Sequence, residues 1–306
     1  MTWQAVLLQQ LINGLTIGAV YALIALGYTM VYGIIQLINF AHGELFVLGA
    51  YVGLTLALLI GMAGPLRGLW GAGMILAMGV AAVAVCAAAG WVVERVAYRP
   101  LRRSPKLAAL ITAIGVSFVL QNVLMLGYGA RDRYLPNPVP MAHWQWHGVT
   151  MTWMHGLMLS TALIVMGGLW WFIRRTRMGQ AMLATEQDPL AARLMGIPTD
   201  QVISWTFVIG SGLAGIGGVL FGLYYTTINF HDGYLTGLKA FTAAVLGGIG
   251  NIPGAMLGGI VLGLLEGLGA GYISSSWKNV FAFVILVLLL LFRPRGLLGE
   301  RVANRA

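Results

Sequence analysis

The uncharged stretch of residues 13–37 constrains the fold of this chain more than any other feature. A helix needs roughly 20 residues to cross a bilayer core of about 30 Å, and this stretch is longer than that. The composition extends the argument to the whole chain, because 59% of its 306 residues are hydrophobic and only 9% are charged. A water-soluble core cannot bury that much apolar surface. The sequence therefore predicts an all-α, polytopic membrane protein in which residues 1–306 form a single transmembrane domain.

Apolar segments of spanning length recur along the chain and predict about eight transmembrane helices. We place them at residues 10–35, 45–62, 69–93, 107–128, 156–173, 202–226, 240–271 and 279–292. The seventh segment is broken near Pro253, which lacks an N–H donor and disfavours helix for the residue before it. We expect a short half-span, a break and then a full span there. If this segment makes two passes, the N-terminus lies outside the cell; with one fewer crossing before Arg95, it lies inside.

A polar sequence, Asn39-Phe40-Ala41-His42-Gly43-Glu44, separates the first two spans without a soluble loop. A carboxylate and an imidazole are costly there unless they face water or protein partners. This sequence is therefore either a tight turn at the membrane surface or part of a translocation path. A related string follows later in the chain: INFAHGEL at 38–45 resembles INFHDGYL at 228–235. Chance similarity is one explanation, and an internal repeat of the kind that frames a central path in many transporters is the other.

Glycines spaced four residues apart predict closely packed helices, because small residues one turn apart let two helix backbones approach. The segment after residue 240 carries two such ladders, Gly250, Gly254 and Gly258, and then Gly259, Gly263, Gly267 and Gly271. Packing within the chain explains most glycines. Two ladders on one segment also leave room for a helix of a partner subunit.

The basic residues predict which ends of the spans face the cytoplasm. The net charge is +9, but thirteen of the eighteen basic residues lie in three short segments: Arg95, Arg99, Arg102, Arg103, Lys106; Arg174, Arg175, Arg177, Arg193; and Arg293, Arg295, Arg301, Arg305. Short cytoplasmic segments of membrane proteins carry this excess of Lys and Arg. We therefore expect these segments to be cytoplasmic and the loop 129–156 and the turn 274–278 to lie outside, with no role for nucleic acid.

The cytoplasmic segment 174–202 contains a short amphipathic helix. Asp188 and Pro189 have the residue types of an N-cap and first helical position, and Leu190 and Leu194 fall on one face. Gly196 ends the helix, with Pro198 just beyond. This helix either packs under the bundle or docks in another protein.

The outer loop 129–156 is rich in tryptophan and histidine. Trp144, Trp146 and Trp153 are typical of interfacial anchors. His143, His147 and His155 do not have the spacing of a metal site, so we expect no metal. A docking surface for a partner is the alternative interpretation of the loop.

Other chemistry is sparse. No phosphate-binding loop, nucleophile–base set or cofactor motif occurs, and Gly210-Ser211-Gly212-Leu213-Ala214-Gly215 matches a dinucleotide motif only within an apolar span. We expect no enzymatic activity and no cofactor. Three acidic residues, Glu44, Asp232 and Glu266, lie near or within spans, where each needs a partner or water. Glu266 is the deepest, and Lys239 is its most plausible cation.

Five segments resemble the LivH-type permease of high-affinity branched-chain amino acid ABC importers, and the resemblance runs nearly end to end. They are TIGAVYALIALGYTMVYGIIQLINFAHGE, ERVAYRPLRRS, LAALITAIGVSFVLQN, RMGQAMLATEQDPLAARLMGI and KAFTAAVLGGIGNIPGAMLGG. The resemblance implies a subunit of a bacterial inner membrane, embedded in lipid and without its own ATPase. It also implies three kinds of partner: a LivM-like second permease, two cytoplasmic ATP-binding subunits and a periplasmic solute-binding protein.

The resemblance assigns a coupling helix that docks on the ATPase. It covers Glu186, Asp188, Leu190, Ala191, Ala192, Leu194 and Gly196. This segment departs from the strict importer motif in its flanks, so the individual contacts stay open.

The implied substrates are leucine, isoleucine and valine, which need apolar walls and partners for an ammonium and a carboxylate. Candidates for polar groups along the path are Asn39, His42, Glu44, Asn229, Asp232, Lys239 and Glu266. Urea or short amides are the alternative substrates. An ion-coupled secondary transporter would explain the repeat and the broken helix, but not the amphipathic cytoplasmic helix. A passive channel for a small polar solute would explain the glycines.

Overall fold

The computed structural model describes residues 3–66, 68–102, 104–140, 142–146, 148–293 and 296–299. His147 and the basic residues Arg103, Arg295, Arg301 and Arg305 lie outside these ranges. The helices are α1 (Trp3–Ile35), α2 (His42–Leu59), α3 (Leu69–Val93), α4 (Lys106–Tyr128), α5 (Trp153–Arg175), α6 (Arg177–Gln187), α7 (Pro189–Leu194), α8 (Thr199–Tyr225), α9 (Asp232–Gly247), α10 (Ile252–Tyr272) and α11 (Lys278–Phe292).

Short elements connect these helices. A π-helical turn, η1 (Glu94–Tyr98), and two 3-10 turns, η2 (Arg99–Leu101) and η3 (Ser275–Trp277), extend or precede spans. Four short strands, β1 (Arg133–Tyr134), β2 (His143–Trp146), β3 (Val149–Thr152) and β4 (Thr227–Ile228), pair antiparallel as β1–β4 and β2–β3.

The expected number of spans is confirmed. Among the described residues, eight helices are long and apolar enough to cross a membrane. The break near Pro253 is also confirmed: α9 is a helix of 16 residues, and α10 starts anew at Ile252. Asn251 caps α10, since its Oδ1 accepts a hydrogen bond from the Gly254 backbone N–H at 3.0 Å.

Several helices start earlier than hydropathy predicts, because polar residues at their ends are stabilised by hydrogen bonds or by the helix dipole. The first helix begins at Trp3 rather than at residue 10, and Gln9 within it exchanges two hydrogen bonds with the backbone of Thr150. The second begins at His42 rather than at residue 45, which places Glu44 in the first helical turn. A carboxylate there is favoured by the helix dipole.

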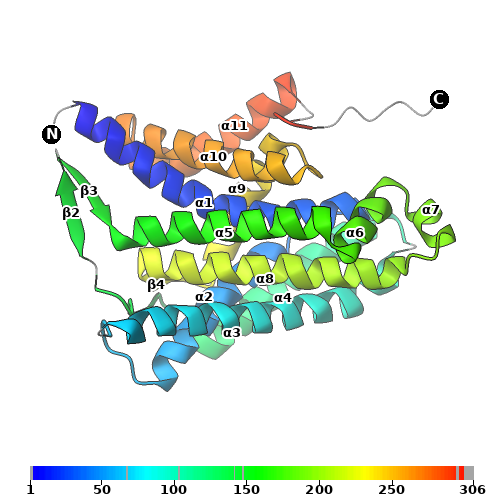
Figure 1. Cartoon of the computed structure of the whole chain (residues 1–306), viewed down its shortest axis with the longest axis horizontal. Helices are drawn as coiled ribbons and strands as arrows, with labels where there is room; N and C mark the ends of the chain where they lie inside the picture. Colours follow the sequence, from blue (N-terminus) through cyan, green and yellow to red (C-terminus); the bar gives the residue numbers. More distant parts are fainter. Residues whose placement is uncertain are drawn as a thin grey trace.

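The two ends of the bundle differ in charge, and this fixes its orientation. The start of α1 lies beside β2 and β3, whereas α6 and α7 lie at the opposite end (Figure 1). The basic residues of η1, η2, α6 and α7 gather at the latter end, where Arg102 pairs with Asp200 at the start of α8. By the positive-inside rule this end is cytoplasmic. The N-terminus therefore lies outside, as expected when the broken segment counts as two passes: α9, which is too short to be one of the eight helices counted above, and α10.

The similarity between residues 38–45 and 228–235 corresponds to a structural repeat. Each string begins a helix in the same way: the His42 N–H donates to the Asn39 carbonyl at 3.0 Å, and the Asp232 N–H donates to the Asn229 carbonyl at 3.1 Å. The preceding helices, α1 and α8, run in opposite directions (Figure 1). In addition, α1 packs against α10 as α8 packs against α3. The repeat is therefore inverted, with α5, α6 and α7 inserted between its halves.

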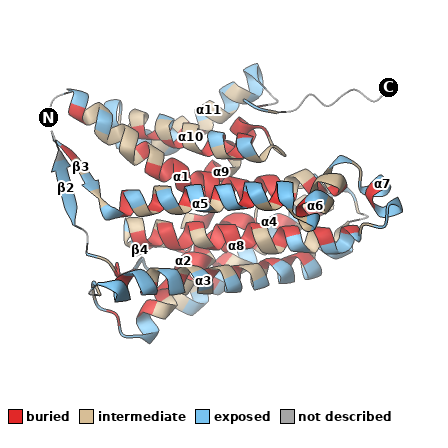
Figure 2. Cartoon of the chain, in the orientation of Figure 1, coloured by how far each residue is buried: buried red, intermediate tan, exposed pale blue. Residues whose placement is uncertain are grey.

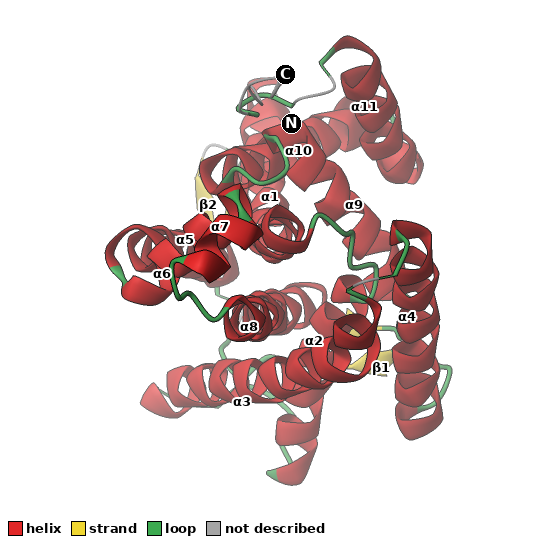
Figure 3. Ribbon diagram, turned by 90° about the vertical axis from the view of Figure 1, so that its right-hand side faces the viewer, coloured by secondary structure: helices red, strands yellow, loops and turns green. Residues whose placement is uncertain are grey.

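The two central helices are the most deeply buried, and glycines bring their neighbours close. Figure 2 shows α1 and α8 largely buried while α3, α5 and α11 keep exposed faces, and Figure 3 shows α1 and α8 from their cytoplasmic ends. Gly259 and Gly263 of α10 lie against α1: a Cβ on Gly263 would stand 2.3 Å from Gly18 Cα. Gly254 and Gly258 lie against α9, so both ladders pack within this chain.

Gly263→Ala should therefore destabilise the protein by about 1–3 kcal/mol or more, because the added methyl group has backbone on its far side and cannot be accommodated without separating α1 from α10. Gly167→Ala is the matched control, since Gly167 lies in α5 with open space around it. There alanine should be neutral or stabilising by up to about 1 kcal/mol. Thermal unfolding in detergent measures both, and equal stabilities would contradict the packing described.

Candidate functional site

The cytoplasmic helix α7 has the ends that its sequence predicts. Asp188 Oδ1 accepts hydrogen bonds from the backbone N–H groups of Leu190 at 2.9 Å and Ala191 at 3.0 Å. Pro189 occupies the first turn. Gly196 has a φ of +83°, a conformation that favours glycine, and ends the helix. Local chemistry alone thus sets both ends of this helix.

One face of α7 is apolar and points away from the bundle. Leu190 is 69% exposed and Leu194 is 81% exposed, and Met195 just beyond the helix is also exposed. Ala192, on the opposite side, is buried. Figure 2 shows α7 as an exposed tip at the cytoplasmic end. Leu190, Leu194 and Met195 together form an exposed apolar surface outside the spans, which is a candidate docking surface.

Glu186 does not belong to this face. It lies in α6 and approaches α1 and the break before α10: a Cβ on Gly33 would stand 2.5 Å from Glu186 Oε1, and one on Gly250 would stand 3.1 Å from it. Of the seven residues assigned to the coupling helix, Glu186 therefore faces the transmembrane helices, whereas Leu190 and Leu194 face outward.

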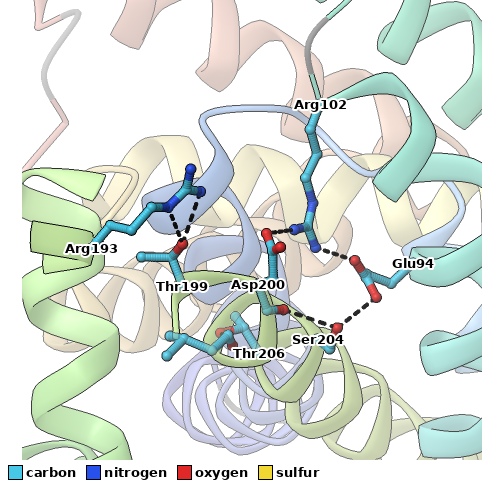
Figure 4. Close-up of polar contacts among 8 residues, drawn as sticks. Glu94, Arg102, Arg193, Thr199, Asp200, Ser204 and Thr206 are labelled. Atoms are coloured by element: carbon cyan, nitrogen blue, oxygen red, sulfur yellow. Dashed lines mark hydrogen bonds and ion pairs between the residues drawn. The ribbon is translucent and has the colours of Figure 1, made fainter. Parts of the chain in front are cut away.

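A polar network fastens the cytoplasmic ends of α3 and α8 together (Figure 4). Arg102 bridges Glu94 and Asp200, and Ser204 Oγ donates to Glu94 Oε2 at 2.7 Å. Glu94 is completely buried, so its charge depends on these partners. The sequence does not predict this network, because nothing in it indicates that Asp200 lies beside Arg102.

The same region holds α7 in place. Arg193, within α7, donates two hydrogen bonds to Thr199 Oγ1, at 3.0 and 3.2 Å (Figure 4). Thr199 begins α8 and lies directly before Asp200. A displacement of α7 would therefore act on the start of α8 and, through Arg102, on the end of α3.

A buried ion pair joins three helices deep in the bundle. Lys239 Nζ lies 2.9 Å from Glu266 Oε1, which confirms the predicted pairing. Tyr21 OH donates to the second oxygen, Glu266 Oε2, at 2.9 Å. Both charged residues are buried. The group from α1, α9 and α10 is thus balanced in charge and in hydrogen bonds.

Unlike the Lys239–Glu266 pair, the polar residues at the start of α2 are only partly hydrogen-bonded. Asn39, His42 and Glu44 are all buried, at 1–2% exposure. Glu44 Oε1 accepts a hydrogen bond from Ser117 Oγ at 3.1 Å, but Glu44 Oε2, His42 Nε2 and Asn39 Nδ2 have no partner among the described residues. Glu44 also forms none of the ion pairs seen in that part of the chain. Buried polar atoms normally have partners, so this concentration of unsatisfied ones makes the start of α2 a candidate binding site.

The start of α9 continues this polar group toward the outer end. Asp232 Oδ2 accepts from the Asn229 N–H at 2.7 Å, and Asn229 Nδ2 donates to Asp132 Oδ1 at 2.6 Å. Next to them, Gln121 Nε2 lies 2.9 Å from His231 Nδ1.

Ser117 and Gln121 are one turn apart on α4, so they connect the outer residues to Glu44. We call the set Asp132, Asn229, Asp232, His231, Gln121, Ser117 and Glu44 the polar track. It leads from exposed Asp132 to buried Glu44. The four-residue spacing of Ser117 and Gln121 in an apolar span was the signal that could have revealed their role.

The structure thus separates the seven path candidates into two groups. Asn39, His42, Glu44, Asn229 and Asp232 lie on or beside the polar track. Lys239 and Glu266 form the separate ion pair.

Aromatic rings lie beside the inner end of the polar track. The Tyr28 and His42 rings meet edge to face with centroids 4.7 Å apart. Phe241 of α9 lies 6.1 Å from Tyr28 and 6.3 Å from Phe40, measured between centroids. A solute bound at Glu44 would therefore have an apolar aromatic wall next to it.

The outer loop forms a hairpin with a defined polar contact at its base. His155 Nδ1 accepts the Thr152 backbone N–H at 3.1 Å, which completes a capping box at the start of α5. Trp144 on β2 and Trp153 are exposed, as interfacial anchors or docking residues must be.

Comparison with known proteins identifies close relatives along almost the whole chain. The family model described as the permease component of branched-chain amino acid transport systems matches residues 10–290. The chain is 47% identical to the high-affinity branched-chain amino acid transport system permease protein LivH of Escherichia coli, covering 96% of each protein. It is equally similar, at 47% over 96% of each protein, to BraD of Pseudomonas aeruginosa, which has the same description. A probable LivH of Methanocaldococcus jannaschii is 26% identical over 90% of this chain and 88% of that protein.

Proposed function

The chain belongs to the family of permease components of branched-chain amino acid transport systems, and we propose that it is the membrane-spanning subunit of an importer for leucine, isoleucine and valine. The observation that carries the proposal is the 47% identity to such permeases over 96% of the chain. The multi-pass bundle, with its basic end in the cytoplasm, accords with a bacterial inner-membrane protein.

Permease components work with ATP-binding and solute-binding subunits. We propose a LivM-like second permease, two cytoplasmic ATP-binding subunits and a periplasmic solute-binding protein as partners. The binding protein would meet the outer loop, residues 129–156. ATP hydrolysis would take place on the partners, so this subunit would have no catalytic residues.

The coupling of ATP hydrolysis to transport is assigned to the segment 174–202. The apolar face of Leu190 and Leu194 would insert into a groove of the ATP-binding subunit, with Asp188, Ala191, Ala192 and Gly196 shaping the helix. Arg193 and the network around Arg102 would pass its movement to α8 and α3. Glu186, at the contact of α6 with α1 and α10, would pass it to the other half of the repeat. ATP and the loaded binding protein must then favour different arrangements of these helices.

The polar track is the proposed substrate path. Among the described residues Glu44 has no cation of its own, whereas Glu266 has Lys239. The ammonium of a neutral amino acid would supply the missing cation at Glu44, and the aromatic rings beside His42 would contact the aliphatic side chain. We therefore place Asn39, His42, Glu44, Asn229 and Asp232 along the path and assign Lys239 and Glu266 to holding α9 in position.

The test of this function is purification of the tagged protein with its native neighbours, identification of the subunits by mass spectrometry, and reconstitution into vesicles. Uptake of labelled leucine that needs both ATP and the binding protein, and that excess urea or acetamide does not inhibit, would support the proposal. A lone homo-oligomer, or uptake driven by an ion gradient, would overturn it in favour of a secondary transporter.

Glu44→Gln should lower leucine uptake in those vesicles by about 10- to 100-fold, because a hydrogen bond to a charged group contributes roughly 1.5–3 kcal/mol. Gln keeps the shape and the bond from Ser117 but loses the charge. Ser117→Ala, which keeps the charge, should reduce uptake only a few-fold. Normal assembly with lost uptake is the expected pattern for Glu44→Gln, and unchanged uptake would remove Glu44 from the path.

A further inference from the structure

A cavity of about 520 Å³ opens on the surface of the bundle between α3 and α8, near the cytoplasmic ends of these helices. Its walls are mainly apolar and include Ala88, Trp91 and Trp205. Arg95 and Arg99 line its cytoplasmic part, together with Asp200. The cavity lies apart from the polar track and from α7's apolar face.

The cavity carries an unbalanced positive charge. The carboxylate of Asp200 is already paired with Arg102, which also binds Glu94 (Figure 4). Arg95 and Arg99 form no ion pair among the described residues, and Arg95 instead lies over the Trp91 ring at 5.6 Å. The guanidinium groups of Arg95 and Arg99 therefore line a cavity whose one carboxylate, Asp200, is already neutralised by Arg102.

The position of the cavity places it at the inner surface of the membrane. The faces of α3 and α8 around it expose large apolar side chains, including Trp91 at 45% and Trp205 at 51%. Exposed tryptophans at span ends mark the interface between lipid and water. Apolar walls on the lipid side and guanidinium groups on the water side match one class of molecule, an anionic amphiphile, because arginine binds phosphate with two parallel hydrogen bonds.

We propose that this cavity binds an anionic phospholipid of the inner leaflet. The phosphate lies at Arg95 and Arg99, and an acyl chain lies against Ala88 and Trp205. The bound lipid fills this cavity beside the Glu94–Arg102–Asp200 network and stabilises the junction of α3 and α8.

The test is native mass spectrometry of the delipidated full chain, with the subunits that copurify, titrated with phosphatidylglycerol. Each basic side chain near an anionic lipid contributes about a fivefold gain in affinity, so Arg95→Gln with Arg99→Gln should weaken binding about 25-fold. Ala88→Phe, which fills the cavity and keeps both arginines, should also abolish specific binding. It serves as the second test if the double variant does not fold.

The matched control is Arg174→Gln with Arg175→Gln. These residues carry the same charge at the same end of the bundle, and Arg174 likewise lies over a tryptophan, Trp170, at 5.1 Å. Phosphatidylglycerol binding should be unchanged in this control. Equal losses in both double variants, undiminished binding in Ala88→Phe, or equal occupancy by phosphatidylcholine or inorganic phosphate would each overturn the proposal.

Discussion

Glu266→Leu should destabilise the protein by about 3–5 kcal/mol, because it leaves the buried ammonium of Lys239 without its counter-ion. Lys239 is 7% exposed and Glu266 is 3% exposed, so water cannot replace the lost partner. Lys239→Met should have a cost of the same order. Tyr21→Phe should cost only about 0.5–1.5 kcal/mol, since the ion pair survives and one hydrogen bond to Glu266 is lost.

The double variant Glu266→Leu with Lys239→Met separates a structural role from a role in transport. Replacing both members of a buried ion pair by apolar residues is often neutral or stabilising, so most of the lost stability should return. Thermal unfolding of the four proteins in one detergent gives the coupling free energy directly. If the single variants are stable but have lost uptake, Glu266 and Lys239 act in the substrate path and do not merely hold α9 in position.

Leu190→Glu with Leu194→Glu should abolish binding of the ATP-binding subunits and lower uptake by at least about 100-fold. Central apolar anchors of an interface typically contribute 2 kcal/mol or more each, which is roughly 30-fold per residue. The stability of the isolated chain should not change, because both side chains are mostly exposed. Copurification of the ATP-binding subunits and the unfolding temperature together measure the effect.

The control for that experiment adds the same two charges nearby. Gln180→Glu with Gln187→Glu places them on exposed positions of α6, away from the apolar face of α7, and loses one exposed hydrogen bond, from Gln180 Nε2 to the Arg174 carbonyl. Assembly and uptake should remain close to normal. If this variant also loses the ATP-binding subunits, the effect is one of charge, and the assignment of Leu190 and Leu194 as anchors is wrong.

Helices and their ends could be predicted wherever local chemistry decides them. Hydropathy predicted the spans, and Asp188 with Gly196 predicted both ends of α7. The distribution of arginine predicted the cytoplasmic end of the bundle. The Lys239–Glu266 pair could be predicted because charged residues are so few within the spans that each had few possible partners.

The polar track could not be predicted in the same way. Ser117, Gln121 and Asp132 are ordinary residues in the sequence, and their role appears only when α4 lies beside the starts of α2 and α9. Arg102 likewise meets Asp200 only because α3 ends beside the start of α8. The family resemblance assigned Glu186 to the docking helix, yet its side chain turns toward Gly33.

The sequence by itself therefore determined which segments cross the membrane, which end faces the cytoplasm and where the short helix α7 starts and stops. These properties depend on the residues of one segment and its solvent. The tertiary structure decided which polar side chains meet and whether the two similar strings form an inverted repeat. Those contacts depend on how each helix is rotated and how closely it approaches its neighbours, and here the approach is set by glycine contacts such as Gly263 on Gly18, between segments far apart in the chain.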